Sequence, residues 1–190
     1  MEHGAEGNPG QDRIKEGEFR EWYFPAEEIL EWARTFLQTA GYELLPPSHI
    51  GFVSPDIHAR KKSEKGSHQI VGVVSQHFDV ALEGLAKLSA IRSVLSDDAD
   101  YVLVLPPVSE FLMLEFFRSE NGRWYREIKH QSFMVWLANP DEEFVWCIIG
   151  GPQDRALEGN FAFGTGGVDA MLAMGELGIL PLSPEELEDY

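Results

Sequence analysis

The sequence predicts one α/β domain in which helices flank a mixed central sheet. The chain has 190 residues, of which 44% are hydrophobic, and this suits a single globular domain with a substantial core. Short apolar runs typical of strands alternate with segments long enough for helices. One stretch has the order strand, helix, strand, which forms a crossover unit and therefore implies at least one parallel pair of strands.

The first helix is the best-defined element. Apolar residues recur at helical spacing between residues 29 and 40. Pro25 suits the first turn of this helix, and Gly41 is placed to end it. The next elements follow from the apolar runs and the polar segments between them: strands at 42–45, 50–60 and 69–75, a polar turn at 61–67, a helix at 79–95 and a strand at 101–105.

The second half of the chain gives weaker patterns. Residues 108–117 favour a helix over a strand. Apolar runs at 133–138 and 144–149 flank a five-residue loop and predict an antiparallel hairpin. The glycine-rich segment 164–167 is interpreted as a flexible connector before a short helix at 168–177. The aromatic residues of this half are interpreted as core residues that alternate on the hairpin strands: Trp124, Tyr125, Phe133, Trp136, Phe144 and Trp146.

Charge is the unusual property of the chain. It has 32 acidic and 15 basic residues and a formal net charge of -17. Such a chain repels the phosphate backbone overall, which excludes indiscriminate coating of nucleic acid. Residues 1–21 are polar and acidic and predict a disordered N-terminal tail. A single α/β domain is expected at 22–190, with an acidic tail at 183–190.

The cysteine content and the hydropathy pattern indicate where the protein is found. The single cysteine, Cys147, cannot form an internal disulfide, which favours a reducing compartment. It lies inside an apolar run and is interpreted as a buried, inert thiol. No apolar run approaches the roughly 20 residues that span a bilayer, so no membrane partner is expected. We therefore expect a cytoplasmic protein.

The order of the elements and the dipeptide Pro55-Asp56 carry a family resemblance. Over residues 26–107 the chain resembles the core of the PD-(D/E)xK superfamily, whose fold is restriction-endonuclease-like; residues 108–182 then form a C-terminal extension that includes the hairpin. In that family the Asp after Pro and an acidic-x-Lys set on the next strand hold Mg²⁺ against the scissile phosphate and orient the attacking water. Here the next strand reads Val73-Val74-Ser75, so one carboxylate and the Lys are missing.

The resemblance implies a small set of candidate site residues. Asp56 corresponds to the family's metal-binding and catalytic Asp. Glu28, on the first helix, is the best candidate for a second metal ligand, and Lys87, on the helix after the central strand, for a displaced catalytic Lys. If the site is active, its cofactor is Mg²⁺ or Mn²⁺; otherwise no cofactor is expected.

Three functions follow from these observations. The first is a nuclease-fold protein without catalysis, because a single carboxylate rarely holds Mg²⁺. The alternative is an acidic protein-interaction or inhibitor module that binds a basic protein partner. The third is a divergent Mg²⁺-dependent nuclease. Nucleic acid is expected to be contacted only through a local basic cluster, which is otherwise a solvated hairpin tip: Arg60, Lys61, Lys62 and Lys65.

Overall fold

A six-stranded mixed sheet forms the centre of the protein, as the sequence predicts. The computed structural model describes residues 24–63, 66–95, 99–108, 113, 116–117 and 119–169. The spatial order of the strands follows their order in the chain. Their bounds are β1 Glu43–Leu44, β2 Ile57–Ser63, β3 Gly66–Val74, β4 Ala99–Leu105, β5 Phe133–Asn139 and β6 Phe144–Ile149.

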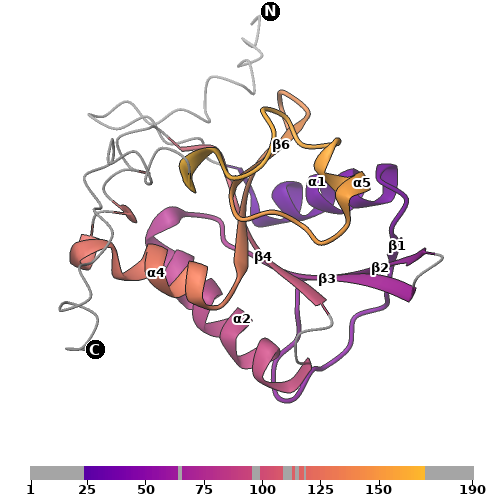
Figure 1. Cartoon of the computed structure of the whole chain (residues 1–190), viewed down its shortest axis with the longest axis horizontal. Helices are drawn as coiled ribbons and strands as arrows, with labels where there is room; N and C mark the ends of the chain where they lie inside the picture. Colours follow the sequence, from indigo (N-terminus) through magenta and orange to yellow (C-terminus); the bar gives the residue numbers. More distant parts are fainter. Residues whose placement is uncertain are drawn as a thin grey trace, which may run out of the picture.

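The sheet combines parallel and antiparallel pairs (Figure 1). β1, β2 and β3 are antiparallel neighbours, β3, β4 and β5 run parallel, and β6 returns antiparallel to β5. The helix α2 (Ala81–Leu95), which follows the short 3-10 turn η1 (Phe78–Val80), connects β3 to β4. This is the predicted crossover unit. The predicted hairpin is also present as β5 and β6, and both strands extend the same sheet.

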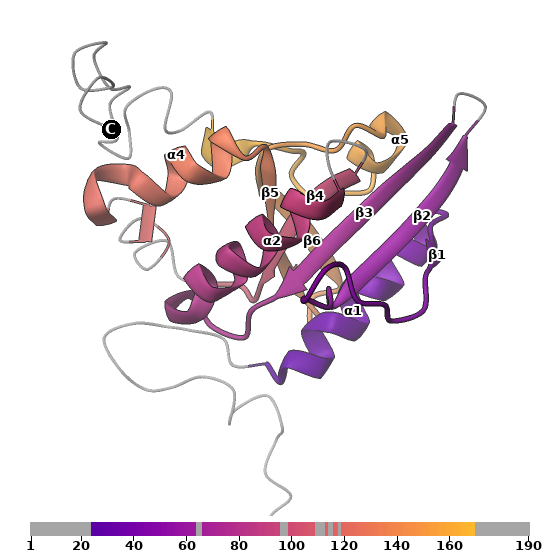
Figure 2. The same cartoon turned by 90° about the horizontal axis from the view of Figure 1, so that it is seen from below.

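Helices cover the two faces of the sheet differently (Figure 2). The helix α1 (Ala26–Thr39) packs on one face through Ile29, Ala33 and Leu37, all fully buried. The opposite face is covered by α2 and by α4 (Arg123–His130), which follows the 3-10 turn η3 (Ser119–Gly122). β4 and β5 are therefore buried on both sides, which explains why their sequences are continuous apolar runs.

Two predicted elements have different bounds in the structure. The strand expected at 50–60 begins only at Ile57, because Ile50 and Val53 instead pair across a two-residue turn in which Gly51 has φ +63°. The polar turn expected at 61–67 is much shorter, since β2 continues to Ser63 and β3 begins at Gly66. Charged side chains are tolerated there because this end of the hairpin is exposed.

Two further interpretations were wrong. Trp124 and Tyr125 lie on α4, not on a hairpin strand, because Gly122 adopts φ +76° and a helix begins after it. The segment 164–167 is not a free connector: Thr165 forms a parallel bridge with Cys147, and Gly166 N donates to Cys147 O at 2.9 Å. It covers the outer edge of β6.

Several predictions lie outside the described residues. They include both tails and most of the helices expected at 108–117 and 168–177. Among the described residues, no helix is both long enough and apolar enough to cross a bilayer.

Candidate functional site

The candidate site lies at the carboxyl ends of the parallel strands. Asp56 precedes β2 and lies beside the last residues of β3: its backbone N donates to Gly72 O at 3.0 Å, and Val74 N donates to its Oδ2 at 2.9 Å. In α/β sheets this end of the parallel strands is where ligands usually bind. The structure therefore places Asp56 next to the strand that contains Val73, as the sequence interpretation requires.

Lys87 reaches Asp56 from α2. Its Nζ lies 3.2 Å from Asp56 Oδ1, and the two side chains are 35% and 30% exposed. Arg34 approaches from α1 on the other side, where its guanidinium donates to Asp56 O at 3.1 Å and also pairs with Glu31 at 3.2 Å. Both oxygens of the Asp56 carboxylate are thus engaged by the protein itself.

A glycine on α2 brings Lys87 this close. A Cβ at Gly84 would lie 2.6 Å from Ser75 Oγ and 2.6 Å from Leu103 Cδ1, which is closer than non-bonded atoms approach. Ser75 and Val73 are buried beneath α2, at 6% and 3% exposure. The helix can therefore pack directly on the strand where the family would carry its second carboxylate and Lys.

Glu28, the second predicted ligand, lies in the first turn of α1 and is partly exposed. It comes from α1, which covers the sheet face opposite to α2. One helical turn further on, Trp32 donates from Nε1 to Phe144 O of β6 at 3.0 Å, whereas Arg34, near Asp56, lies on a different flank of the helix. By helical spacing, Glu28 shares the flank of Trp32 and not that of Arg34.

The residues at Asp56 do not fit a magnesium site. Mg²⁺ requires near-octahedral oxygen ligation, and one Asp56 oxygen faces the Lys87 ammonium while the other accepts a backbone N–H. Within the described residues, no three His, Cys, Asp or Glu side chains lie close enough together to hold a metal ion.

A pocket adjoins Asp56 at the β1–β2 edge of the sheet. Its volume is about 380 Å³, within the range of small-molecule sites. Leucines and prolines from α1, from the end of β1 and from the segment between β1 and β2 form most of its wall, and polar groups come from four residues: Arg34, Ser48, Asp56 and His58. Sequence reasoning missed this pocket because the path of the 45–55 segment depends on tertiary contacts.

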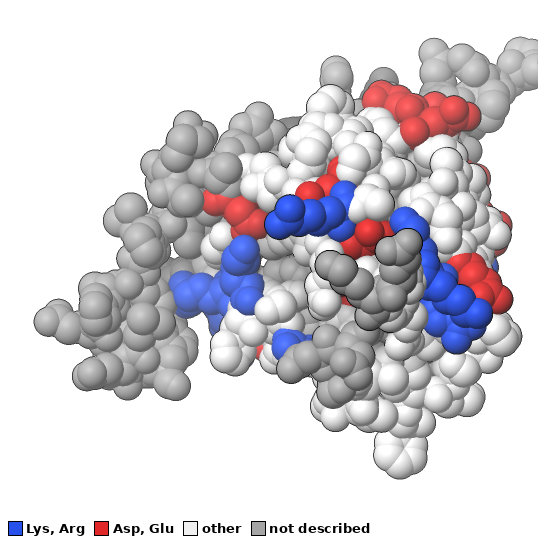
Figure 3. Space-filling view, turned by 45° about the vertical axis from the view of Figure 1, so that its right-hand side comes forward, with Lys and Arg blue, Asp and Glu red and all other residues white. Residues whose placement is uncertain are grey.

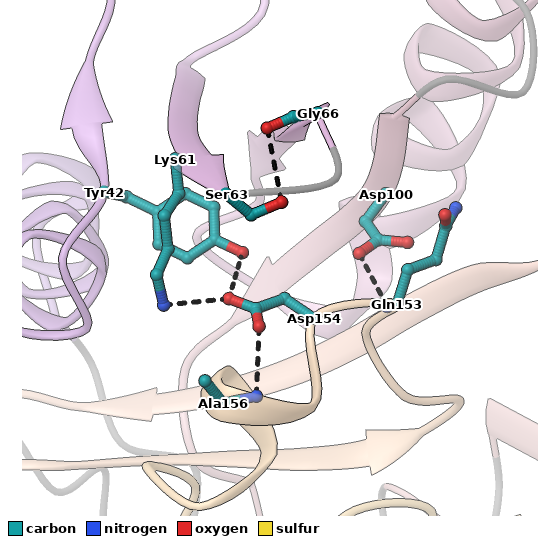
Figure 4. Close-up of polar contacts among 8 residues, drawn as sticks. All are labelled: Tyr42, Lys61, Ser63, Gly66, Asp100, Gln153, Asp154 and Ala156. Atoms are coloured by element: carbon teal, nitrogen blue, oxygen red, sulfur yellow. Dashed lines mark hydrogen bonds and ion pairs between the residues drawn. The ribbon is translucent and has the colours of Figure 1, made fainter.

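A second polar cluster lies at the other end of the sheet, on the α1 face (Figure 4). Asp154 Oδ2 accepts hydrogen bonds from Tyr42 OH at 3.1 Å and from Lys61 Nζ at 2.9 Å. Its Oδ1 accepts from Ala156 N at 3.0 Å, and this hydrogen bond caps the short helix α5 (Arg155–Glu158). Burial opposes ionisation of this carboxyl, but its three donors hold the pKa of Asp154 below its ordinary value. Burial and Asp154 raise the pKa of Tyr42.

Asp100, at the start of β4, behaves in the opposite way. Gln153 N donates to its Oδ2 at 2.9 Å. Burial nevertheless raises the pKa of Asp100, because the hydrogen bonds from Gln153 offset only part of the lost hydration. No motif pointed to Asp100 or Asp154; two lone aspartates in strand-end and loop positions carry no sequence signal.

The predicted basic cluster is partly neutralised. Lys61 pairs with Asp154, and Arg60 pairs with Glu43 at 3.5 Å, while Lys62 is exposed and Lys65 lies outside the described residues. Figure 3 shows Lys and Arg side chains next to Asp and Glu side chains across the face that it displays. That face therefore has mixed charge, without a broad patch of either sign.

Comparisons with known proteins give weak matches. No protein-family model and no curated protein sequence matches the chain. Two solved structures are similar to the chain. The first is an XisH family protein from Nostoc punctiforme, with 11% sequence identity and a TM-score of 0.41. The second is an fdxN element excision controlling factor protein from Anabaena variabilis, with 14% sequence identity and a TM-score of 0.40. Each match covers 63% of this chain and 96% of the other. At this level the likeness carries no argument about function, which has to come from the chain's own residues.

Proposed function

We propose that the chain has the restriction-endonuclease-like fold that its sequence resembles and that it does not cleave phosphodiesters with a metal ion. The observation that carries this proposal is the contact between Asp56 and Lys87, 3.2 Å from Oδ1 to Nζ. An ammonium group occupies the side of the carboxylate that a metal ion would need. Val73 and Ser75 supply no second carboxylate, so the fold persists without the family's chemistry.

Metal titration tests this proposal directly. Mg²⁺ and Mn²⁺ are titrated calorimetrically into the wild-type protein, Asp56→Asn and Glu83→Gln. The last variant removes an exposed carboxylate from α2 and matches the change in charge. We expect no saturable binding by any of the three and no cleavage of supercoiled DNA or single-stranded RNA above background.

A divergent nuclease gives a different result. Saturable binding that disappears in Asp56→Asn but persists in Glu83→Gln, together with cleavage that follows the same pattern, would replace the proposal with a metal-dependent nuclease. Binding that persists in all three proteins would reflect the general acidity of the chain.

A second candidate function is the binding of a basic protein partner. The formal net charge of -17 favours it. Sixteen of the 32 acidic and ten of the 15 basic residues lie in the described part of the chain, which therefore carries a net charge of -6. The described part of the chain alone is thus acidic enough to attract a cationic partner.

A peptide probe tests the second candidate. A synthetic peptide of alternating Arg and Gly residues is compared with the same peptide in which citrulline replaces Arg. We expect the Arg peptide to bind, its affinity to fall steeply between low and high ionic strength, and the citrulline peptide to bind at least tenfold more weakly. Equal binding of the two peptides would contradict this function.

A further inference from the structure

The edge strand β6 carries an open cluster of aromatic rings. Phe163 lies against Phe144 and Trp146, with ring centroids 5.8 and 5.7 Å apart and interplanar angles of 79° and 77°. Phe163 is 77% exposed, and the other two residues are half-buried. We call these three residues the aromatic cluster. Its rings meet edge to face, so the outer ring is held in place while most of its surface faces solvent.

The backbone presents Phe163 at a conformational cost. Ala162 N donates to Val145 O and Gly166 N to Cys147 O, both at 2.9 Å, so the segment between them is pinned along the outer edge of β6. Within it Phe163 has φ +61°, a conformation that bulky residues rarely adopt. An exposed ring gains little from burial. Stability of the fold therefore does not account for a Phe here, and such outliers point to function.

Carboxylates lie directly beside the aromatic cluster in sequence. The β5–β6 turn, which ends at Phe144, contains Glu142 and Glu143, both exposed. Asn139 Oδ1 accepts from the backbone N of Asp141 and of Glu142, each at 3.1 Å, and this fixes the turn. Aromatic faces and carboxylates together bind cationic side chains, because a guanidinium or ammonium group is attracted to the face of a ring and to the carboxylates.

We infer that the aromatic cluster and the β5–β6 turn form the docking surface for an arginine- or lysine-rich segment of a protein partner. This inference rests on the second candidate function and names the place where the partner binds. A purely apolar segment fits less well because it would desolvate the carboxylates of the turn without pairing them. Nucleic acid fits less well because those carboxylates repel phosphate.

Variants of the two most exposed phenylalanines test the aromatic part. Phe163→Asn removes the ring and keeps a residue that tolerates positive φ. The matched control is Phe52→Asn: Phe52 is fully exposed in the segment between β1 and β2, at the opposite edge of the sheet. We expect Phe163→Asn to weaken binding of the Arg-Gly peptide about fivefold to tenfold and Phe52→Asn to leave it within about twofold. Phe144→Leu replaces a ring while keeping apolar contacts and serves as the second variant if Phe163→Asn does not fold.

Charge variants test the acidic part at constant net charge. The double variant Glu142→Gln/Glu143→Gln is compared with Glu27→Gln/Glu83→Gln, which removes two exposed carboxylates from the first turns of α1 and α2. We expect the double variant in the β5–β6 turn to weaken binding of the Arg-Gly peptide at least threefold more than the double variant on α1 and α2 does. The indole signal of Trp146, assigned in an NMR spectrum with Trp146→Phe, should shift on binding.

The outcomes separate the docking surface from the function on which it rests. If the wild-type protein binds the Arg-Gly peptide and the variants at β6 behave like their controls, the docking surface is wrong and the second candidate function stands. If the wild-type protein binds neither peptide at low ionic strength, both fail.

Discussion

Two of the Asp–Lys pairs among the described residues lie at opposite ends of the sheet and on opposite faces. At the carboxyl ends of the parallel strands, Asp56 and Lys87 are 3.2 Å apart and about one-third exposed. At the other end, Asp154 and Lys61 are 2.9 Å apart, and their side chains are 11% and 25% exposed. The same two residue types thus form one partly solvated pair and one largely buried pair.

The hydrogen bonds around the two pairs explain what each can do. Asp154 accepts from Lys61, Tyr42 and Ala156 and joins α5 to β2. It has little capacity left for a ligand, so we regard this pair as structural. Asp56 accepts from Lys87 and from one backbone N–H, and it borders a pocket. Similar chemistry therefore has a different role at each end of the sheet.

The largest loss of stability is expected from Asp154→Ala. It leaves Lys61 and Tyr42 without their acceptor and removes the cap of α5, so the free energy of unfolding should fall by about 3 kcal/mol. Urea denaturation followed by circular dichroism measures this. Asp154→Asn, which keeps an acceptor for the cap, should lose roughly half as much. Equal stability of Asp154→Ala and wild type would show that the cluster is not structural.

The next largest effect is expected from Gly84→Ala. The added methyl would overlap Ser75 Oγ and Leu103, and relief of this overlap should cost about 1–3 kcal/mol while moving Lys87 away from Asp56. Thermal denaturation compares it with Gly159→Ala, where the nearest atom to the new methyl is 3.9 Å away and φ is -68°. The control should change stability by less than about 0.5 kcal/mol. If Gly84→Ala were as stable as wild type, α2 would not pack as closely on Ser75 and Leu103 as the structure shows.

Sequence reasoning predicted the site residues unevenly, and the reasons are physical. The pattern of apolar runs predicted the crossover unit, whose helix carries Lys87, and the preceding strand, next to which Asp56 lies. It did not predict the α4 helix, whose start depends on the positive φ of Gly122. Nor did it predict the Asp154 cluster, because that contact joins residues more than 90 positions apart, and only the folded sheet brings them together.

A smaller effect is expected from Lys87→Met. The pair is one-third exposed, so solvent screens it, and its loss should lower the free energy of unfolding by less than about 1 kcal/mol. The methionine keeps the apolar stem of the lysine on α2. Urea denaturation of Lys87→Met and Lys61→Met in parallel should therefore give a clearly larger loss for Lys61→Met. Equal losses would remove the distinction between the two pairs.

The smallest effect concerns the dependence of stability on pH. The pKa of Asp154 is lowered on folding, so its contribution is present above the pKa of the unfolded chain and is lost as the pH falls through the folded-state pKa. The pKa of Asp100 is raised by burial, so its contribution is present below the unfolded pKa and is lost as the pH rises through the folded-state value.

Two variants test these opposite contributions. As the pH rises from acidic to neutral, Asp100→Asn should become more stable relative to wild type, whereas Asp154→Asn should become less stable. Denaturation midpoints measured from about pH 2 to about pH 7 cover both titrations, and parallel curves would contradict the opposite shifts. Opposite slopes would show that the balance between burial and hydrogen-bond donors at each carboxylate decides which of the two stays charged.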